Sequence, residues 1–236
     1  MALGNFDGFH AGHQAVVGRA IARAKAEGRP AIVATFDPHP MRLFRPDTPS
    51  FRLTTLDQRE ALFARAGADA MMIFDFTPAL AALEPADYVR VLIEDMGVAA
   101  VVTGEDFTFG RARSGTIDSF AALGLPAQAV GPVSDGQGII SSTRVREALR
   151  AGDCETACRL LTRPFAIRGV VQHGDKLGRT IGFPTANIDM GPYLRPAYGI
   201  YAVRGILPDG RVLNGAANLG IRPSFDPPKE LLEPHF

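Results

Sequence analysis

The stretch Leu3-Gly4-Asn5-Phe6-Asp7-Gly8-Phe9-His10-Ala11-Gly12-His13 decides the fold, because it carries a short apolar segment into a predicted helix through glycines spaced four apart. Glycine lets the backbone turn sharply and approach a ligand without a Cβ in the way. The helix is predicted over residues 14–27, where apolar side chains recur on one face, and Gly28 ends it. A helix N-terminus offers N–H groups and partial positive charge, to which His10 and His13 add donors. The stretch therefore predicts a phosphate site where a strand runs into a helix.

Two other interpretations of this stretch stay open. Glycine turns between a strand and a helix are common packing devices, and a lone glycine-rich turn is weak evidence for a nucleotide site. His10 and His13 could also be half of a metal site, but they lack the glutamate of a His-Glu-x-x-His motif and lie at the mouth of the helix. We expect a phosphate site rather than a metal site.

Strands and helices alternate over the first two thirds of the chain. Apolar runs at residues 31–36, 70–74 and 98–103 predict strands, and residues 56–66 and 86–96 predict helices between them. This alternation is typical of a parallel sheet with helices on its faces, in which ligands bind beyond the carboxyl ends of the strands. We expect an α/β fold with a Rossmann-like domain over residues 1–162.

The pattern changes near Arg163. Residues 165–172, 199–205 and 211–217 form short alternating or apolar runs, and Leu207-Pro208-Asp209-Gly210 predicts a hairpin turn. These features predict a second, smaller domain over residues 163–236, mainly antiparallel and built as a β-barrel.

The composition argues against several partners. The 25 basic residues equal the 25 acidic ones, so no net positive field would gather nucleic acid or anionic lipid, and a small-molecule partner is expected. No apolar run approaches the length of a membrane span and no secretion signal begins the chain, which makes the cytoplasm the expected compartment. Cys154 and Cys158 are predicted to be packing residues. The sequence makes no prediction of the oligomeric state.

The second predicted strand ends in Thr35-Phe36-Asp37-Pro38-His39-Pro40. Two prolines restrict this loop and hold the His39 imidazole with little conformational freedom. By itself, the motif is equally compatible with an ordinary surface turn.

The stretch from Thr103 to Gly115 places Phe107 and Phe109 between glycines and ahead of arginines. The aromatic rings offer stacking surface and Arg113 a bidentate donor, which together suit a ring that carries a phosphate. In the alternative, one of the two phenylalanines is a core residue of an edge strand.

The stretch Ile140-Ser141-Ser142-Thr143-Arg144-Val145-Arg146-Glu147 opens another predicted helix. Capping explains the Ser-Ser-Thr run, and Glu147 could complete a capping box. Capping does not explain the arginines, since cations are disfavoured near a helix N-terminus unless an anion is present.

The second domain carries its chemistry in a glycine-rich stretch that runs from Gly174 to Asn187. A loop with several glycines and two cations can fold over phosphates, and Thr185 and Asn187 face the same way on an extended segment. Hydroxyl and amide oxygens are suitable ligands for Mg²⁺. The alternative is a barrel loop with solvated charges.

In this order, the motifs resemble those of the prokaryotic bifunctional riboflavin kinase/FAD synthetases. The stretches Gly4–Gly8 and His10–His13 resemble their nucleotidyltransferase signature, and residues 140–146 resemble the element that holds the ATP triphosphate. Residues 178–187 resemble their riboflavin kinase signature, and residues 232–236 the segment with their catalytic glutamate.

The resemblance implies phosphorylation of riboflavin to FMN and adenylylation of FMN to FAD with release of pyrophosphate, both with ATP and Mg²⁺. The implied catalytic residues are His10, His13, Arg146 and Glu233. The implied ATP site of the adenylyltransferase comprises Gly4, Asn5, Phe6, Asp7, Gly8, Gly12, Ser141, Ser142, Thr143 and Arg144. Its implied flavin site comprises Asp37, His39, Pro40, Asp106, Phe107, Phe109 and Arg113. The implied ATP site of the kinase comprises Gly174, Lys176, Gly178, Arg179, Gly182, Pro184 and Tyr201, with Thr185 and Asn187 as metal ligands.

The two reactions make different demands on the protein. The phosphate of FMN is already anionic at neutral pH, so adenylylation needs positioning and charge neutralisation rather than a general base. A ribityl hydroxyl must lose a proton as it attacks the γ-phosphate, and the resemblance makes Glu233 the base.

The resemblance covers nearly the whole chain. Because Met1 falls on the first predicted strand and Phe236 within a structured region, we expect family sequence to be missing at both ends and the kinase half to be incomplete. One alternative is a nucleotidyltransferase of another specificity, such as a cytidylyltransferase with a regulatory second domain. The other is a flavin-nucleotide binding fragment without turnover.

Overall fold

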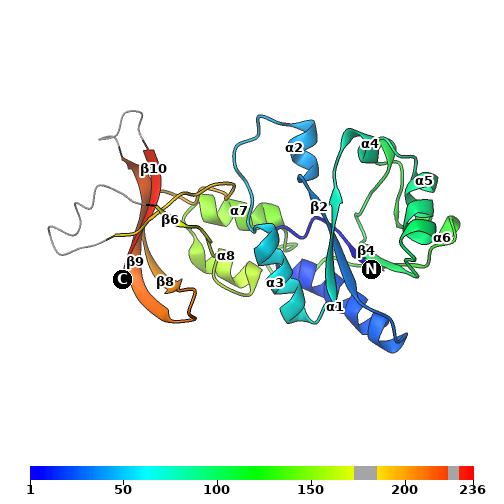
Figure 1. The fold of residues 1–236 in the computed structure, drawn as a ribbon, viewed down its shortest axis with the longest axis horizontal. Coiled ribbons are helices and arrows are strands. Elements are labelled where there is room, and N and C mark those ends of the chain that lie inside the picture. The colour runs from blue at the N-terminus through cyan, green and yellow to red at the C-terminus, as the bar shows by residue number, and fades with distance from the viewer. Residues whose placement is uncertain (173–184, 223–228) are drawn as a thin grey trace. The chain divides into compact units, whose positions relative to one another are not determined.

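The computed structural model describes residues 1–172, 185–222 and 229–236, and its chain forms two compact units (Figure 1). The first unit contains Met1–Pro49, Thr54–Ser142 and Leu160–Arg163. The second contains Ser50–Leu53, Thr143–Arg159 and Pro164–Phe236. Each unit is described below by itself.

The first unit is built on a parallel sheet in the order β3-β2-β1-β4-β5. Its strands are β1 (Ala2–Leu3), β2 (Ile32–Asp37), β3 (Ala70–Asp75), β4 (Val101–Gly104) and β5 (Ala127–Val130). Its helices are α1 (Ala11–Ala26), α2 (Pro40–Phe44), α3 (Leu56–Ala66), α4 (Pro78–Ala81), α5 (Pro85–Arg90), the π-helical η1 (Val91–Asp95), the 3-10 turn η2 (Arg111–Arg113) and α6 (Ile117–Ala122). Strand β1 lies at the centre, so the loop after it lies between those after β2 and β4.

Helices cover both faces of this sheet (Figure 1). On one face, Val17 of α1 and Phe63 of α3 pack against Val33 and Val102 of the sheet. The other core cluster contains Tyr88 of α5, Leu92 of η1 and Phe120 of α6, with side chains of the same strands. Successive apolar residues of β2 and of β4 point to opposite faces of the sheet and therefore contribute to both cores.

The boundaries of α3 follow from local chemistry. Thr55 is its N-cap and forms a capping box with Gln58, and Gly67 ends it with a left-handed φ of 96°. The predicted range of residues 56–66 is therefore confirmed.

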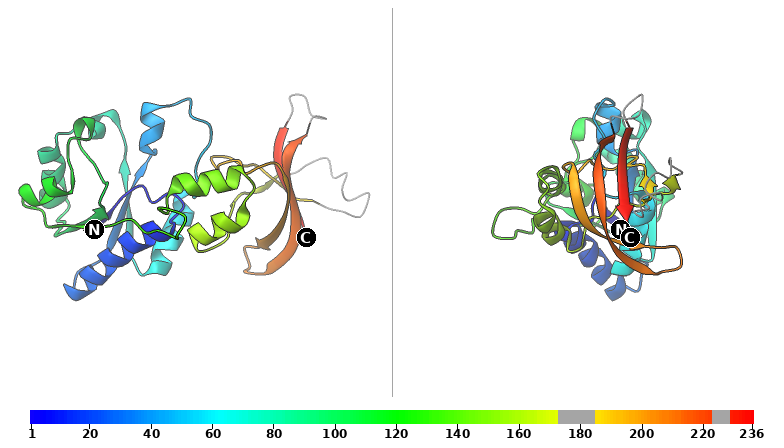
Figure 2. Two further views of the ribbon diagram at one scale, coloured as in Figure 1. Left: turned by 180° about the vertical axis from the view of Figure 1, so that it is seen from behind. Right: turned by 90° about the vertical axis from the view of Figure 1, so that its left-hand side faces the viewer.

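The second unit contains a five-stranded antiparallel sheet in the order β6-β7-β10-β9-β8. The strands are β6 (Val171–Gln172), β7 (Asn187–Ile188), β8 (Gly199–Ile206), β9 (Val212–Arg222) and β10 (Lys229–His235). Figure 2 shows β8, β9 and β10 as neighbours. Most of α7 (Ser142–Arg150) and of α8 (Cys154–Leu161) also belongs to this unit. Met190, Tyr193 and Leu219 form a core on one face of the sheet.

The predicted fold class, a parallel α/β domain followed by a smaller antiparallel one, is confirmed, but several element boundaries differ. Helix α1 begins at Ala11 rather than residue 14, because the His10 side chain caps it. Strand β4 begins at Val101, since the Val98 N–H donates to Leu92 O at 2.8 Å at the end of the preceding helix. The helix predicted over residues 86–96 is divided between α5 and η1, and β5 was not predicted.

The strand predicted over residues 165–172 is confined to Val171–Gln172. Phe165 and Ile167 pack against the core without pairing in a strand, and the Arg168 N–H donates to the Tyr193 hydroxyl at 3.0 Å. Alternating burial thus reflects side-chain packing here rather than a strand. Strand β9 runs on to Arg222, beyond the predicted end at residue 217, because it pairs with β10 over that length.

None of the helices in the described part of the chain is long and apolar enough to cross a membrane.

Candidate active site

The loop after β1 has a constrained backbone. Phe6 and Phe9 adopt left-handed φ values of 48° and 43°, and Gly8 lies between them with a φ of 84°. Such a conformation costs a residue other than glycine about 1–3 kcal/mol. Both phenylalanine rings are buried and contact Phe63 edge to face, at centroid distances of 5.8 Å and 5.1 Å. Core packing therefore holds the loop in a conformation that its backbone alone would avoid.

The two histidines lie together at the mouth of α1. Their rings stack with centroids 3.7 Å apart, and His10 is buried. The His10 Nδ1 accepts a long hydrogen bond of 3.4 Å from the His13 N–H. A neutral imidazole that accepts at Nδ1 carries its proton on Nε2, which makes Nε2–H a donor. The pair thus combines a capped helix N-terminus with imidazole donors, as a phosphate site requires.

Gly12 is the glycine on which this arrangement depends most. A Cβ at this position would lie 3.1 Å from His10 Cε1 and 3.4 Å from the Ile140 carbonyl oxygen. Any side chain at this position would press on the His10 imidazole.

Thr54 holds the loop after β1 through hydrogen bonds to Asp7 and Gly8. Its hydroxyl accepts from the Gly8 N–H at 2.9 Å and donates to Asp7 Oδ1 at 3.2 Å, while its own N–H donates to the same oxygen at 3.0 Å. Both Asp7 and Thr54 are buried. The Asp7 carboxylate therefore holds the backbone in place.

Arg59 of α3 makes a second attachment. Its guanidinium is buried and donates to the Asn5 carbonyl at 3.1 Å and to the Thr35 hydroxyl at 2.8 Å. Thr35 in turn donates to the Asn5 carbonyl at 2.8 Å, which joins the end of β2 to the loop after β1.

The first residue of α7, Ser142, contacts the loop after β1. The Ser142 hydroxyl donates to the Asp7 carbonyl at 2.9 Å, so two motifs separated by 135 residues adjoin in one unit. Arg144 and Arg146 belong to the second unit, where Arg146 Nε donates to the Phe51 carbonyl at 2.9 Å and its guanidinium lies 5.4 Å from the Phe51 ring centroid. Thr143 is exposed and Ser141 half-buried.

The first group of predicted flavin residues follows β2. Asp37 is the last residue of β2, and His39 is the N-cap of α2, where its Nδ1 accepts from the Met41 N–H at 3.1 Å. Pro40 begins α2. Because β2 neighbours β1 in a parallel sheet, this loop leaves the same edge of the sheet as the loop after β1.

The second group follows β4. Phe109 is buried and stacks on Phe120 at 4.1 Å, whereas Phe107 is partly buried at the edge of the same cluster. Arg113 Nε donates to the Thr108 hydroxyl at 2.9 Å, and Asp106 lies in the turn directly after β4. Phe109 thus takes the core position that was the alternative for one of the two rings.

The second unit brings three predicted kinase residues to one region. Strand β7 pairs with β10 through Ile188 and Leu232, and the Ala186 N–H donates to the Pro234 carbonyl at 2.9 Å, so that Asn187 lies opposite Glu233. Glu233 is buried, and Thr185 is exposed beside the same strand.

Asn218 extends this arrangement on the other side of β10, where it pairs with Glu233. Directly opposed residues of neighbouring strands point to the same face with Cβ atoms about 5 Å apart. Asn187, Glu233 and Asn218 therefore form a polar row across three strands.

The other predicted kinase residues do not join this polar row in the described structure. Tyr201 packs against the apolar core and donates to the Ala197 carbonyl, and burial raises the pKa of its hydroxyl. Gly174, Lys176, Gly178, Arg179, Gly182 and Pro184 lie outside the described residues.

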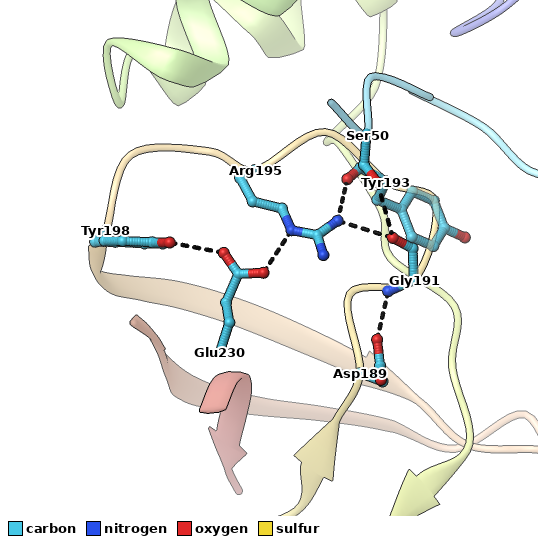
Figure 3. Close-up of polar contacts among 7 residues, drawn as sticks. All are labelled: Ser50, Asp189, Gly191, Tyr193, Arg195, Tyr198 and Glu230. Carbon is cyan, nitrogen blue, oxygen red and sulfur yellow. Dashed lines mark hydrogen bonds and ion pairs between the residues drawn. The ribbon is translucent and has the colours of Figure 1, made fainter. Parts of the chain in front are cut away.

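An ion pair stabilises the connection between β7 and β8 (Figure 3). Arg195 Nε bonds to Glu230 Oε2 at 2.6 Å, and its Nη1 donates to two carbonyls of the 191–193 segment at 2.8 Å and 2.6 Å. The Tyr198 hydroxyl donates to Glu230 Oε1 at 2.7 Å, and this bond raises the pKa of Tyr198. Glu230 thus holds the loop, while Glu233 is the β10 carboxylate in the polar row.

Comparison with known proteins gives two matches to family models. The model described as FAD synthetase matches residues 1–144, and the one described as riboflavin kinase matches residues 161–236. A bifunctional riboflavin kinase/FMN adenylyltransferase from Bacillus subtilis is 38% identical over 231 residues, which cover 95% of this chain and 72% of the relative. The chain belongs to this family.

Other members of the bifunctional family are similarly close. The Escherichia coli K12 relative is 35% identical over 241 residues, covering 100% of this chain and 77% of its own length. A solved structure titled as a macrolide-efflux protein from Streptococcus pneumoniae has a TM-score of 0.89 and 31% identity, with 99% of this chain and 78% of that chain covered. This similarity supports the same two-part fold.

The family suggested by the ordered motifs is therefore confirmed, while the role of each residue stays a prediction. Sequence reasoning missed Thr54, Arg59 and Asn218. The Thr-Thr pair at positions 54–55 carries a helix-cap signal, which points to Thr55 and gives no sign that its neighbour reaches Asp7. A buried arginine within an amphipathic helix has no sequence signal at all.

Proposed function

We propose that this protein makes FAD in two ATP-dependent steps, with the adenylyltransferase in residues 1–162 and the kinase in residues 163–236. The contact between the Ser142 hydroxyl and the Asp7 carbonyl carries the first assignment, because it joins two phosphate-binding motifs at one strand-to-helix junction. The FAD synthetase and riboflavin kinase family matches support the pair of reactions.

In the adenylylation step, a phosphate oxygen of FMN attacks the α-phosphorus of ATP, and the bond to the departing pyrophosphate breaks. The nucleophile is already ionised, so the protein contributes positioning and charge stabilisation. His10 and His13 donate to the phosphate oxygens, and the N-terminus of α1 adds its dipole. We assign Gly4, Asn5, Phe6 and Gly8 to the backbone of this site, with Ser141 and Ser142 as its second phosphate-binding element.

The flavin would lie near the loops after β2 and β4, which flank the phosphate loop at the same sheet edge. His39 and the partly buried Phe107 are the better candidates for contact with the ring. Phe109 would support Phe107 from within the core. Asp37, Pro40, Asp106 and Arg113 complete the proposed flavin site.

In the kinase step, the terminal ribityl hydroxyl of riboflavin attacks the γ-phosphorus of ATP, and the bond to ADP breaks. Glu233 accepts the hydroxyl proton as the new oxygen–phosphorus bond forms. Its burial and its place opposite Asn187 support this assignment.

Mg²⁺ would neutralise the ATP phosphates in both steps. The Thr185 hydroxyl and the Asn187 amide oxygen are hard donors that fit this ion, and they lie beside the Glu233 strand. The described residues contain no cluster of three or more His, Cys, Asp or Glu side chains that could hold a metal ion.

The test is separate incubation with riboflavin plus ATP–Mg²⁺ and with FMN plus ATP–Mg²⁺, followed by chromatography of the flavins. We expect FAD and pyrophosphate from the second mixture. FAD formation without FMN formation from riboflavin would refute the kinase assignment and leave the adenylyltransferase assignment standing. Turnover of CTP in place of ATP, or flavin binding without pyrophosphate release, would refute the adenylyltransferase assignment.

A further inference from the structure

The chain returns to the first unit for four residues, Leu160–Arg163, between two segments of the second unit. Gln14, in the first turn of α1, donates through Nε2 to the Leu161 carbonyl at 3.3 Å, the Thr162 hydroxyl at 2.9 Å and the Phe9 carbonyl at 2.9 Å. Gln14 therefore connects residues 160–163 with the loop between β1 and α1, the proposed nucleotide loop.

Arg163 donates three hydrogen bonds, two of them to the same loop. Its guanidinium donates to the Gly8 carbonyl at 2.7 Å, the Phe9 carbonyl at 3.2 Å and the Leu161 carbonyl at 3.0 Å. Burial and the nearby Arg65 lower the pKa of Arg163, but a guanidinium remains protonated. A planar fork of donors is the group that can hold several carbonyls in fixed directions.

These bonds determine how two peptide groups of the loop are oriented. The carbonyl and N–H of a trans peptide point in opposite directions. With the Phe9 carbonyl held by Gln14 and Arg163, the His10 N–H of the same peptide points away from these two side chains. Loss of the donors would allow this peptide to turn.

The contacts also join two residues under backbone strain. Phe9 has a φ of 43° and Thr162, a β-branched residue, has a φ of 61°. Left-handed conformations of this kind persist only where the surroundings impose them. The loop and the segment before Pro164 thus hold each other in conformations that neither would keep alone.

We infer that Arg163 is a positioning residue for adenylyl transfer: it holds the backbone of Gly8 and Phe9 in the conformation that receives the ATP phosphates, and it links that loop to the segment leading into the kinase unit. The inference rests on the proposed adenylyltransferase function. Linkage is reciprocal, so ATP bound at the loop must also stabilise residues 160–163.

The test compares Arg163→Gln and Arg163→Lys with the unmodified protein in steady-state adenylylation of FMN. For Arg163→Gln we expect the KM for ATP to rise about tenfold or more, since bonds from a charged donor to the loop are lost. The kcat and the KM for FMN should stay within about twofold, because Arg163 touches neither reacting group. Lysine keeps the charge without the fork, so Arg163→Lys should fall between the two proteins.

Arg159→Gln is the matched control, because Arg159 is an exposed arginine of α8 whose guanidinium donates to the Thr156 hydroxyl at 3.3 Å. A second readout needs no turnover: a non-hydrolysable ATP analogue should slow amide hydrogen exchange in residues 160–163 of the unmodified protein, and less so in Arg163→Gln. Circular dichroism establishes that each variant is folded. If Arg163→Gln does not fold, Arg163→Lys decides.

An unchanged KM for ATP in a folded Arg163 variant, or equal losses in kcat and in the affinities for both substrates, would overturn the inference. Failure of the unmodified protein to make FAD would instead refute the proposed function, and the exchange experiment would then decide the inference alone.

Discussion

Replacing Thr54 with valine tests whether the buried contacts around Asp7 hold the nucleotide loop in its binding conformation. Valine keeps the shape of threonine and removes the hydroxyl, which bonds to the Gly8 N–H at 2.9 Å and to Asp7 Oδ1 at 3.2 Å. A buried N–H without a partner costs about 1–3 kcal/mol, and a bond to a carboxylate contributes about 1.5–3 kcal/mol. Asp7 keeps its bond from the Thr54 N–H, so we take about 3 kcal/mol as the combined loss.

If this loss of free energy destabilises the binding conformation of the loop, a smaller fraction of the protein can bind ATP. The KM for ATP should then rise about ten- to a hundredfold. The assay is FAD formation from FMN at varied ATP, with urea denaturation in parallel. Thr55→Val is the matched control, because Thr55 caps α3 without touching the loop. It should cost about 1 kcal/mol of unfolding free energy and leave the KM for ATP unchanged. Equal KM values for the two valine variants would refute the reasoning.

Three further substitutions separate activity from stability. Gly12→Ala should leave the urea midpoint nearly unchanged, since the helix preference of alanine, about 1 kcal/mol, offsets the loss of the His10 cap, also about 1 kcal/mol. It should lower kcat/KM for FAD formation at least about tenfold by displacing His10, and an active variant would show that the ring tolerates a Cβ 3.1 Å from Cε1. Glu233→Gln should reduce riboflavin phosphorylation by about 10²–10⁴ in kcat without changing adenylylation of FMN, and retention of kinase activity in a preparation that phosphorylates riboflavin would exclude it as the base. Tyr88→Phe should be neutral or stabilising by up to about 2 kcal/mol in urea denaturation, because the buried Tyr88 hydroxyl has no hydrogen-bond partner among the described residues; a clear loss of stability would reveal a partner.

The elements that sequence predicted best are those with local causes. The boundaries of α3 follow from a capping box and a terminal glycine, which lie within the helix and its flanks. The start of α1 was predicted three residues late, because a histidine supplies the cap that serine, threonine or aspartate usually provides. The alternation of Phe165 and Ile167 suggested a strand because burial against a core has the same period as strand pairing, and hydrogen-bond partners decide between them.

By itself, the sequence determined the family and the order of its motifs, since each motif is a run of neighbouring residues whose spacing carries the chemistry. Tertiary structure decided which residues support those motifs. Thr54, Arg59 and Arg163 reach the nucleotide loop from positions 46 to 155 residues away, and Asn218 reaches Glu233 through strand pairing. These contacts depend on long-range packing of buried polar groups, which leaves no periodic signal in the chain, and for that reason only the folded protein reveals them.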